Sequence, residues 1–297
     1  MIRLLRRLVE DPPPALAFEL SEAGIAAARP GRPPRIGFEP LEPGVLSVSP
    51  LHDNVQQAER LAAHVRALAG EREGRKRRDA VLILPDASVR VLVLDFDAFP
   101  SSPAEQLSLV RFRIRKGLPF DLDSAALSYA PQPGDGRRVD VVAAVAPLEI
   151  VARYEAPLRA CGLAPGLVTT STLAALELVR ESGVAVLLKL SGRFMTISVL
   201  ERGALKLLRA IELAEISPGE ILAPLYPTMA YAEDQLGARP DKLLLGGFGS
   251  ATADLRRLME LELGAPVEPL VSRYGEVEDY NAGLLGWLES LEAGGTQ

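Results

Sequence analysis

Apolar and polar positions follow the same order twice along the chain. In the first half, apolar runs predict strands at residues 15–20, 25–29, 45–48 (a looser run) and 80–84. Between the last two runs, apolar residues at helical spacing predict a helix that begins at Ser49 or Asp53 and ends at Gly70. These elements follow the order β-β-β-α-β, which begins a β-β-β-α-β-α unit.

The second half repeats this order. Apolar runs predict strands at residues 184–190, 194–200, 205–211 and 242–245. Glu201-Arg202-Gly203 is the expected turn between the second and third of these strands. Helices are expected at 218–236 and at 251–263, the second closed by Gly264. Two successive β-β-β-α-β-α units predict two related lobes with a cleft between them.

The segment from Asp86 to Pro165 has a different character and predicts an inserted β-α-β-β-α subdomain. Its expected elements are a strand at 89–96, a helix from Ser102, two strands around the turn 133–136, and a helix from Leu148 to Gly162. Ser102 and Glu105 have the spacing of a capping box. A further helix is expected near 172–181. The predicted domains are a first lobe (1–78), the inserted subdomain (79–164), and a return helix with the second lobe (165–297).

Composition excludes several classes of function. A net charge of −6 disfavours a general nucleic-acid binder. The single cysteine, Cys161, excludes an internal disulfide and a Cys-rich zinc site, and neither His52 nor His64 has a second ligand at metal-binding spacing. Residues 1–9 lack the continuous apolar region of a signal peptide, and no stretch is long enough to cross a bilayer. We expect a cytoplasmic protein unless a partner holds it at a membrane.

The hairpin that opens each lobe is where a two-lobed protein of this order normally holds phosphates. Such hairpins use backbone amides in a glycine-containing turn, together with an acidic residue that places Mg²⁺ or the attacking water. The string Gly246-Gly247-Phe248-Gly249-Ser250 has the form of a loop beside adenine, where a helix N-terminus offers amides to an anion. It is also an ordinary tight turn between a buried strand and a helix.

Four strings, in this order and spacing, resemble the PilM family of type IV pilus assembly proteins, which are relatives of FtsA among the actin-like ATPases. They are LPDASV at 84–89, GLPFDL at 117–122, VDVVAAV at 139–145 and LRACGL at 158–163. The resemblance covers most of the chain. It implies an α/β fold with the two-lobed actin-like ATPase (RNase H-like) architecture and an inserted β-α-β-β-α subdomain.

The chain departs from this family at both phosphate loops. The family's D-I-G-S-S-S-V-K aligns with residues 19–26, so that Glu19, Ser21 and Ala26 stand for the aspartate, the first glycine and the lysine. The D-I-G of the second loop aligns with Lys189-Leu190-Ser191. A lysine in place of a metal-positioning acid cannot hold Mg²⁺, so we expect no catalytic residue, no metal and no required cofactor, and we doubt that ATP binds. The expected remnants of a nucleotide site are Gly246, Gly247, Gly249, Ser191 and Gly192.

Charged residues outside these loops leave alternatives open. Lys189 and Arg193 either hold an anion in place of Mg²⁺ or form a surface ion pair with Glu19 or Glu22. Three basic clusters stand out, at Arg3-Arg6-Arg7, Arg75–Arg78 and Arg111–Lys116. The first suits an amphipathic helix on anionic lipid, packing on the protein, or an unstructured segment. The second suits a solvated turn, and the third belongs to a helix of the inserted subdomain.

The resemblance implies a partner, namely the cytoplasmic N-terminal tail of a PilN-like bitopic membrane protein, captured beside the inserted subdomain. Other pilus assembly components are further expected partners, and self-association stays open. The leading hypothesis is a non-catalytic scaffold of a type IV pilus, or of a related type II secretion system, held at the inner membrane through its partners. The alternative is an ATP-binding actin-like protein with weak or slow ATPase activity. A sugar- or acetate-kinase-like enzyme would need an acidic base and intact phosphate loops.

Overall fold

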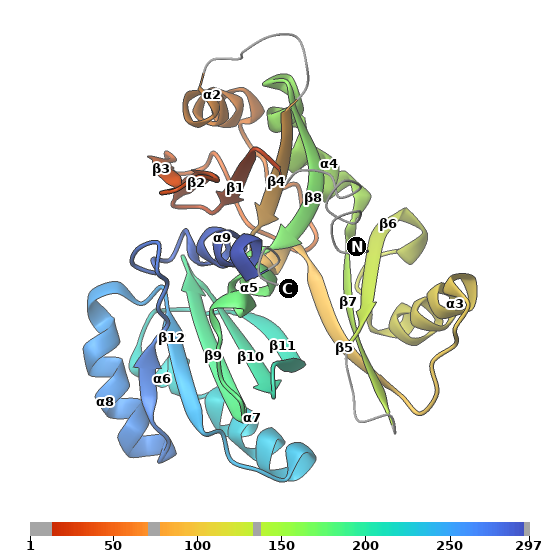
Figure 1. The fold of residues 1–297 in the computed structure, drawn as a ribbon, viewed down its shortest axis with the longest axis vertical. Coiled ribbons are helices and arrows are strands. Elements are labelled where there is room, and N and C mark those ends of the chain that lie inside the picture. The colour runs from red at the N-terminus through yellow and green to blue at the C-terminus, as the bar shows by residue number, and fades with distance from the viewer. Residues whose placement is uncertain (1–13, 71–77, 133–137, 294–297) are drawn as a thin grey trace, which may run out of the picture.

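The computed structural model describes residues 14–70, 78–132 and 138–293, and its strands form three sheets (Figure 1). The first sheet contains β1 (Leu16–Leu20), β2 (Gly24–Arg29), β3 (Arg35–Pro40), β4 (Arg78–Leu84) and β8 (Leu163–Thr170). Its strand order is β3-β2-β1-β4-β8. β1, β2 and β3 are antiparallel to one another, whereas β4 and β8 continue the sheet in parallel with β1.

The second sheet has the same arrangement. It contains β9 (Val184–Ser191), β10 (Phe194–Glu201), β11 (Ala204–Glu212), β12 (Lys242–Gly246) and β13 (Val267–Pro269). Its order is β11-β10-β9-β12-β13, again with three antiparallel strands followed by two parallel ones. The internal repeat predicted from the sequence is therefore confirmed, and each sheet is the centre of one lobe.

Helices cover both faces of the first sheet, which explains why every residue of β1 is buried. Along β1, successive side chains point to opposite faces. Phe18 packs with α2 (Ala58–Ala69) and α4 (Leu148–Ala160), whereas Ala17 packs with α9 (Ala282–Ala293). A strand with two buried faces needs apolar residues at nearly every position.

The helices of the second lobe pack on the second sheet around one apolar cluster. They are α6 (Pro218–Leu222), α7 (Leu225–Tyr231) and α8 (Thr252–Leu263). The single helix expected at 218–236 is divided at Pro224, because proline lacks the amide that would continue the hydrogen-bond ladder. The expected end of α8 is confirmed, since Gly264 has φ +66 at its C-cap.

The third sheet belongs to the inserted part of the chain. It contains β5 (Arg90–Phe96), β6 (Ala125–Pro131) and β7 (Val139–Pro147) in the order β5-β7-β6. The helix α3 (Pro103–Ile114) covers this sheet with Val110 and Ile114. The expected capping box is wrong, because the Ser102 side chain makes no cap hydrogen bond; the Ser102 carbonyl accepts from the Gln106 amide at 2.9 Å instead.

The sheet pairings bear on the expected domain boundaries at 78/79 and 164/165. β4 and β8 are hydrogen-bonded strands of the first sheet, and α4 packs in the core of the first lobe through Tyr154 and Leu158. The expected boundaries put α4 and nearly all of β4 in the inserted subdomain and most of β8 in the third domain. We therefore propose that the inserted unit is the smaller segment 90–147, and that the first lobe also includes residues up to 170.

The third strand of the first sheet differs from the prediction. It is Arg35–Pro40, and the expected strand near 45–48 is a buried loop in which Leu46 makes one isolated bridge with Val55. The run 45–48 is apolar because it is buried under the first lobe. β3 is an edge strand with mostly exposed side chains and with Gly37 and Pro40 in it, so its pattern is weak.

The first helix also begins later than expected, at Ala58. The preceding loop is held by Asn54, whose side chain accepts from the Ser49 amide at 2.9 Å and donates to the Ser49 carbonyl at 2.8 Å. Tyr154 on α4 donates to the same Asn54 oxygen at 3.0 Å. These side-chain bonds replace the backbone bonds of the expected first helical turn.

Two helices lie between the lobes. α5 (Ser171–Ala175), continued by a short turn at Leu176–Leu178, packs against α9, and α9 in turn contacts both sheets (Figure 1). The helix expected near 172–181 is thus shorter than predicted. Gly286 allows the close packing of these helices, because a Cβ there would lie 2.1 Å from the Ala174 carbonyl oxygen.

We expect Gly286→Ala to lower the free energy of unfolding by about 1–3 kcal/mol, because the added methyl group forces α9 away from α5. Gly219→Ala in α6 is the matched control, since nothing lies within 4 Å of a Cβ at that position; it should be neutral or slightly stabilising, by up to about 1 kcal/mol. Urea denaturation measures both. Equal changes in the two variants would contradict the close packing of α5 and α9.

Candidate functional site

The hairpins that open the two lobes carry opposite charges at equivalent positions. β1 pairs antiparallel with β2 and parallel with β4, and β9 pairs in the same way with β10 and β12. In this register Glu19 lies beside Ala26, and Lys189 lies beside Thr196. Glu19 and Lys189 therefore occupy the same place in the two repeats.

Lys189 is buried, with 2% of its surface exposed, and its Nζ atom lies 3.0 Å from Oδ2 of Asp86. Asp86 begins a short turn directly after β4, so this ion pair joins the first lobe to the second. The expected surface ion pair of Lys189 with Glu19 or Glu22 is wrong in both partner and environment. The alternative of an external anion is also not needed, because a carboxylate of the chain itself neutralises the ammonium.

Asp86 accepts hydrogen bonds from three further donors. The Thr172 amide donates to Oδ1 at 2.7 Å, and the hydroxyls of Thr172 and Thr196 donate to Oδ2 at 2.6 and 2.9 Å. Burial raises the pKa of Asp86, but the charge of Lys189 and the bonds from Thr172 outweigh burial and lower that pKa below its ordinary value. Asp86 is thus an ionised carboxylate at neutral pH.

Glu19 is the second buried carboxylate at the lobe junction, and 2% of its surface is exposed. It accepts from the Ser171 hydroxyl and, at 2.7 Å, from the Leu284 amide at the start of α9. Burial raises the pKa of Glu19, and it outweighs the opposing effects of Lys189 and of these hydrogen bonds. The two lobes therefore meet at two carboxylates and one ammonium.

Sequence reasoning included Asp86 only as part of a family-like string and did not assign it a role. The signal available was its position, because an acidic residue directly after a buried strand lies at the edge of the sheet where ligands and partner lobes meet. The sequence pattern does not predict that Asp86 pairs with Lys189, because Lys189 lies in the other repeat.

The space beside Asp86, between the two hairpin turns, is nearly filled, whereas a second pocket of about 540 Å³ is lined by Glu22 and Ala23 of the first turn and Arg193 of the second. Ser21, Glu22, Asp86, Ser191 and Phe194 line a cavity of about 10 Å³, which is the smallest size that holds one water molecule. The first turn is closed on itself, since the Ser21 amide donates to the Gly24 carbonyl at 2.9 Å. Glu22 accepts a hydrogen bond from the Val48 amide at 2.7 Å. Its other oxygen lies beside Gly192, 3.8 Å from the position that a Cβ atom would take at that residue. The polar side chains that face this space are carboxylates and hydroxyls, and Val48, Pro85, Ala87 and Phe194 complete its lining.

A magnesium-bound triphosphate does not fit these residues. The volume is too small for a hydrated Mg²⁺, which usually keeps several of its waters. Lys189 provides an ammonium where the cation would need an acidic ligand, and Glu22 would repel phosphate. Among the described residues, no group of three His, Cys, Asp or Glu side chains is arranged to hold a metal ion.

The glycines of the adenine-like loop have neighbours within the protein. Gly247 has φ +81, and a Cβ there would lie 2.3 Å from the Leu190 carbonyl oxygen. This contact explains why residue 247 is glycine without any purine. Gly246 lies at the end of β12, and Gly249 lines, with Gly247, a separate cavity of about 830 Å³. Of the expected nucleotide residues, Ser191 therefore lines the small cavity and Gly247 and Gly249 the large one, while Gly246 and Gly192 line neither.

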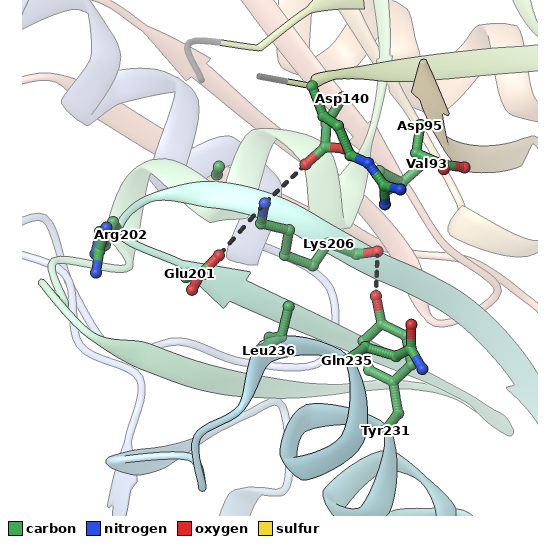
Figure 2. Close-up of a pocket in the computed structure, with 11 residues that line it drawn as sticks. Val93, Asp95, Asp140, Glu201, Arg202, Lys206, Tyr231, Gln235 and Leu236 are labelled. Carbon is green, nitrogen blue, oxygen red and sulfur yellow. Dashed lines mark hydrogen bonds and ion pairs between the residues drawn. The ribbon is translucent and has the colours of Figure 1, made fainter. Parts of the chain in front are cut away.

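A further cavity, of about 790 Å³, lies between the inserted unit and the second lobe (Figure 2). In it, Nζ of Lys206 on β11 lies 2.7 Å from Asp140 on β7 and 3.4 Å from Glu201 on β10. Burial lowers the pKa of Lys206, but the hydrogen bonds and charges of these two carboxylates outweigh it and raise that pKa. Beside this cavity, the Gln132 side chain exchanges two 2.7 Å hydrogen bonds with the backbone of Leu205. The inserted unit is thus fastened to the edge strand of the second sheet.

The remaining charged candidates have ordinary surface partners. Arg193 pairs with Glu212 at 3.1 Å, and His64 lies 3.6 Å from Glu42. In the third basic cluster, Arg111 pairs with Asp123. The first cluster, and all of the second except Arg78, lie outside the described residues. None of the described helices combines the length and the apolar character needed to span a membrane.

Comparison with known proteins yields matches in structure and none in sequence. No protein-family model and no curated protein matches the chain. A chain of the PilM–PilN type IV pilus biogenesis complex is similar with a TM-score of 0.70 and 22% identity, covering 95% of this chain and 98% of that one. The cytoplasmic domain of EpsL, an inner membrane component of the type II secretion system of Vibrio cholerae, is similar with a TM-score of 0.50 and 15% identity, covering 93% and 94% of the two chains.

A third solved structure carries the fold in its description. It is a Bacteroides thetaiotaomicron protein with an actin-like ATPase fold and unknown function, which has a TM-score of 0.51 and 14% identity and covers 85% of this chain and 89% of its own. Identities this low establish the fold alone. The two-lobed actin-like ATPase architecture predicted from the sequence is therefore confirmed.

The raised pKa of Glu19 predicts a pH dependence. A carboxyl whose folded-state pKa is raised contributes stability below its unfolded pKa of about 4.3, and this contribution is lost as the pH rises through the folded value. In Glu19→Gln the Ser171 hydroxyl can accept from the new amide, while the Gln carbonyl accepts from Leu284. We expect the stability of this variant to rise relative to wild type between pH 5 and pH 8, as measured by urea denaturation. Parallel pH profiles would show that Glu19 is not the group responsible.

Proposed function

Because the chain has the actin-like ATPase fold, we propose that it is a non-catalytic scaffold of a type IV pilus or type II secretion assembly at the inner membrane. Its partner in this proposal is the cytoplasmic tail of a PilN-like bitopic membrane protein. The similarity over nearly the whole length of chains from the PilM–PilN complex and from EpsL supports the assembly role. The shared fold alone is compatible with other roles. The non-catalytic part of the proposal therefore rests on the altered phosphate loops.

The observation that carries the non-catalytic role is the buried pair of Lys189 and Asp86. Phosphoryl transfer in this kind of site depends on a divalent cation that neutralises phosphate charge. Here an ammonium occupies the point between the two phosphate-type hairpins, and the adjoining space is about 10 Å³. Both features oppose the binding of Mg-ATP between the lobes. A protein built in this way is suited to presenting surfaces to partners.

A surface for the partner tail is supported beside the inserted unit. β8 is an edge strand of the first sheet on the side toward the inserted unit, and Leu167 on this strand is 47% exposed (Figure 1). An edge strand can pair with an extended peptide, whose alternate side chains then enter neighbouring pockets. The bonds of Gln132 and Lys206 to the second lobe keep the inserted unit in place as one wall of this surface. We therefore place the tail along β8.

The alternative is an ATP-binding actin-like protein with slow hydrolysis. The observation in its favour is the cavity of about 830 Å³ beside Gly247 and Gly249, at the start of α8. A nucleotide there would contact the adenine-like loop while its phosphates lay away from Lys189. Hydrolysis would then need another acid near those phosphates.

We expect a fluorescently labelled peptide, taken from the N-terminal tail of a bitopic pilus or secretion protein of the same organism, to bind the full chain in an anisotropy titration. Leu167→Asp should weaken binding at least 10-fold, because it places a charge on the proposed strand-pairing surface. Leu261→Asp on α8 is the control, since Leu261 is 79% exposed and lies on the other lobe. If no tail peptide binds, or if the two variants weaken binding equally, the proposed partner surface is wrong.

A further inference from the structure

Two buried carboxylates lie at the lobe junction with one buried cation, which pairs with Asp86 and acts on Glu19 through its charge. Glu19 comes from β1, Asp86 from the turn after β4, and Lys189 from β9 in the other lobe. Among the described residues, Lys189 is the sole buried lysine or arginine. Lys189 is therefore the one buried cation near both carboxylates, which also accept hydrogen bonds from α5, β10 and α9.

A buried carboxylate without a compensating cation is costly, and removing one partner of a buried ion pair leaves such a charge behind. The hydroxyl and amide donors around Asp86 reduce this cost but carry no full positive charge. The Lys189 ammonium, 3.0 Å from Asp86, supplies that positive charge. Because Lys189 belongs to the second lobe and both carboxylates to the first, the same charge also holds the lobes together.

The internal repeat indicates which other residue type would suit position 189. Position 189 is the equivalent of Glu19, and an acidic residue there would bring three carboxylates around one site. Three carboxylates suit a hard divalent cation such as Mg²⁺ or Mn²⁺. A lysine at 189 removes one of these acids and brings its own positive charge.

We propose that the Lys189 ammonium takes the place of a divalent cation at the lobe junction, so that the two lobes keep one arrangement without metal or nucleotide. This inference does not depend on the proposed partner tail, because it concerns only how the lobes are held. Substituting position 189 should therefore expose a latent metal site. The small cavity beside Ser191 would gain the volume of the lysine stem.

The test is the thermal unfolding of wild type and Lys189→Asp in EDTA and in 5 mM MnCl₂ or MgCl₂. We expect the midpoint of wild type to be the same in all three buffers. The midpoint of Lys189→Asp should be lower in EDTA and should rise by about 5 °C or more with Mn²⁺. Lys116→Asp, at an exposed position after α3, is the matched control and should show no such rise.

Either of two results would overturn the proposal. The first is a folded Lys189→Asp variant whose midpoint does not change with Mn²⁺ or Mg²⁺. The second is a wild type that these ions stabilise as much as they stabilise the variant.

Lys189→Met decides the matter if Lys189→Asp does not fold. It keeps the stem volume and removes the charge, so that protons on Asp86 or Glu19 must neutralise the site. Glu22, which lines the small cavity, is a further carboxylate that faces it. A proton taken up in the folded state stabilises the variant at low pH. We expect its loss of midpoint relative to wild type to be several degrees larger at pH 8 than at pH 5. An equal loss at both pH values would show that the ammonium charge is not what joins the lobes.

Discussion

A charge buried at the junction of two lobes constrains everything around it. Lys189 and Asp86 lie 3.0 Å apart and are almost completely shielded from water, so each needs the other to remain ionised. The Thr172 and Thr196 hydroxyls complete the shell of Asp86, and they come from α5 and from β10. Any motion that separates the lobes must therefore break a set of bonds to a single carboxylate.

The rest of the architecture is consistent with a fixed arrangement of the lobes. α5 and α9 lie between the sheets and pack closely through Gly286, while α9 contributes the Leu284 amide to Glu19. Gln132 also hydrogen-bonds to the backbone of the edge strand β11 and fastens the inserted unit to the second lobe. Opening and closing around a nucleotide is the usual use of a two-lobed fold. The scaffold that we propose for this chain would instead need a fixed arrangement of the lobes.

The sequence predicted the repeat and most strands because buried strands need apolar residues at nearly every position, as β1 and β9 do. It missed β3, because an exposed edge strand with Gly37 and Pro40 has little apolar pattern. It also missed the partner of Lys189. Glu19 and Glu22 were the nearest acids by analogy between the hairpins, but the turn after β4 brings Asp86 closer. Such pairings depend on how two lobes dock, which periodicity does not encode.

The most direct test of the central claim is the thermal unfolding of the wild-type protein with and without millimolar Mg-ATP. A ligand at about 100 times its Kd stabilises the folded state by about 2.7 kcal/mol. If the ammonium of Lys189 and the nearly filled space beside it oppose the binding of Mg-ATP at the lobe junction, as we propose, the unfolding midpoint is the same in both conditions. A midpoint that rises with Mg-ATP concentration, and does not rise with Mg²⁺ alone, would contradict the account.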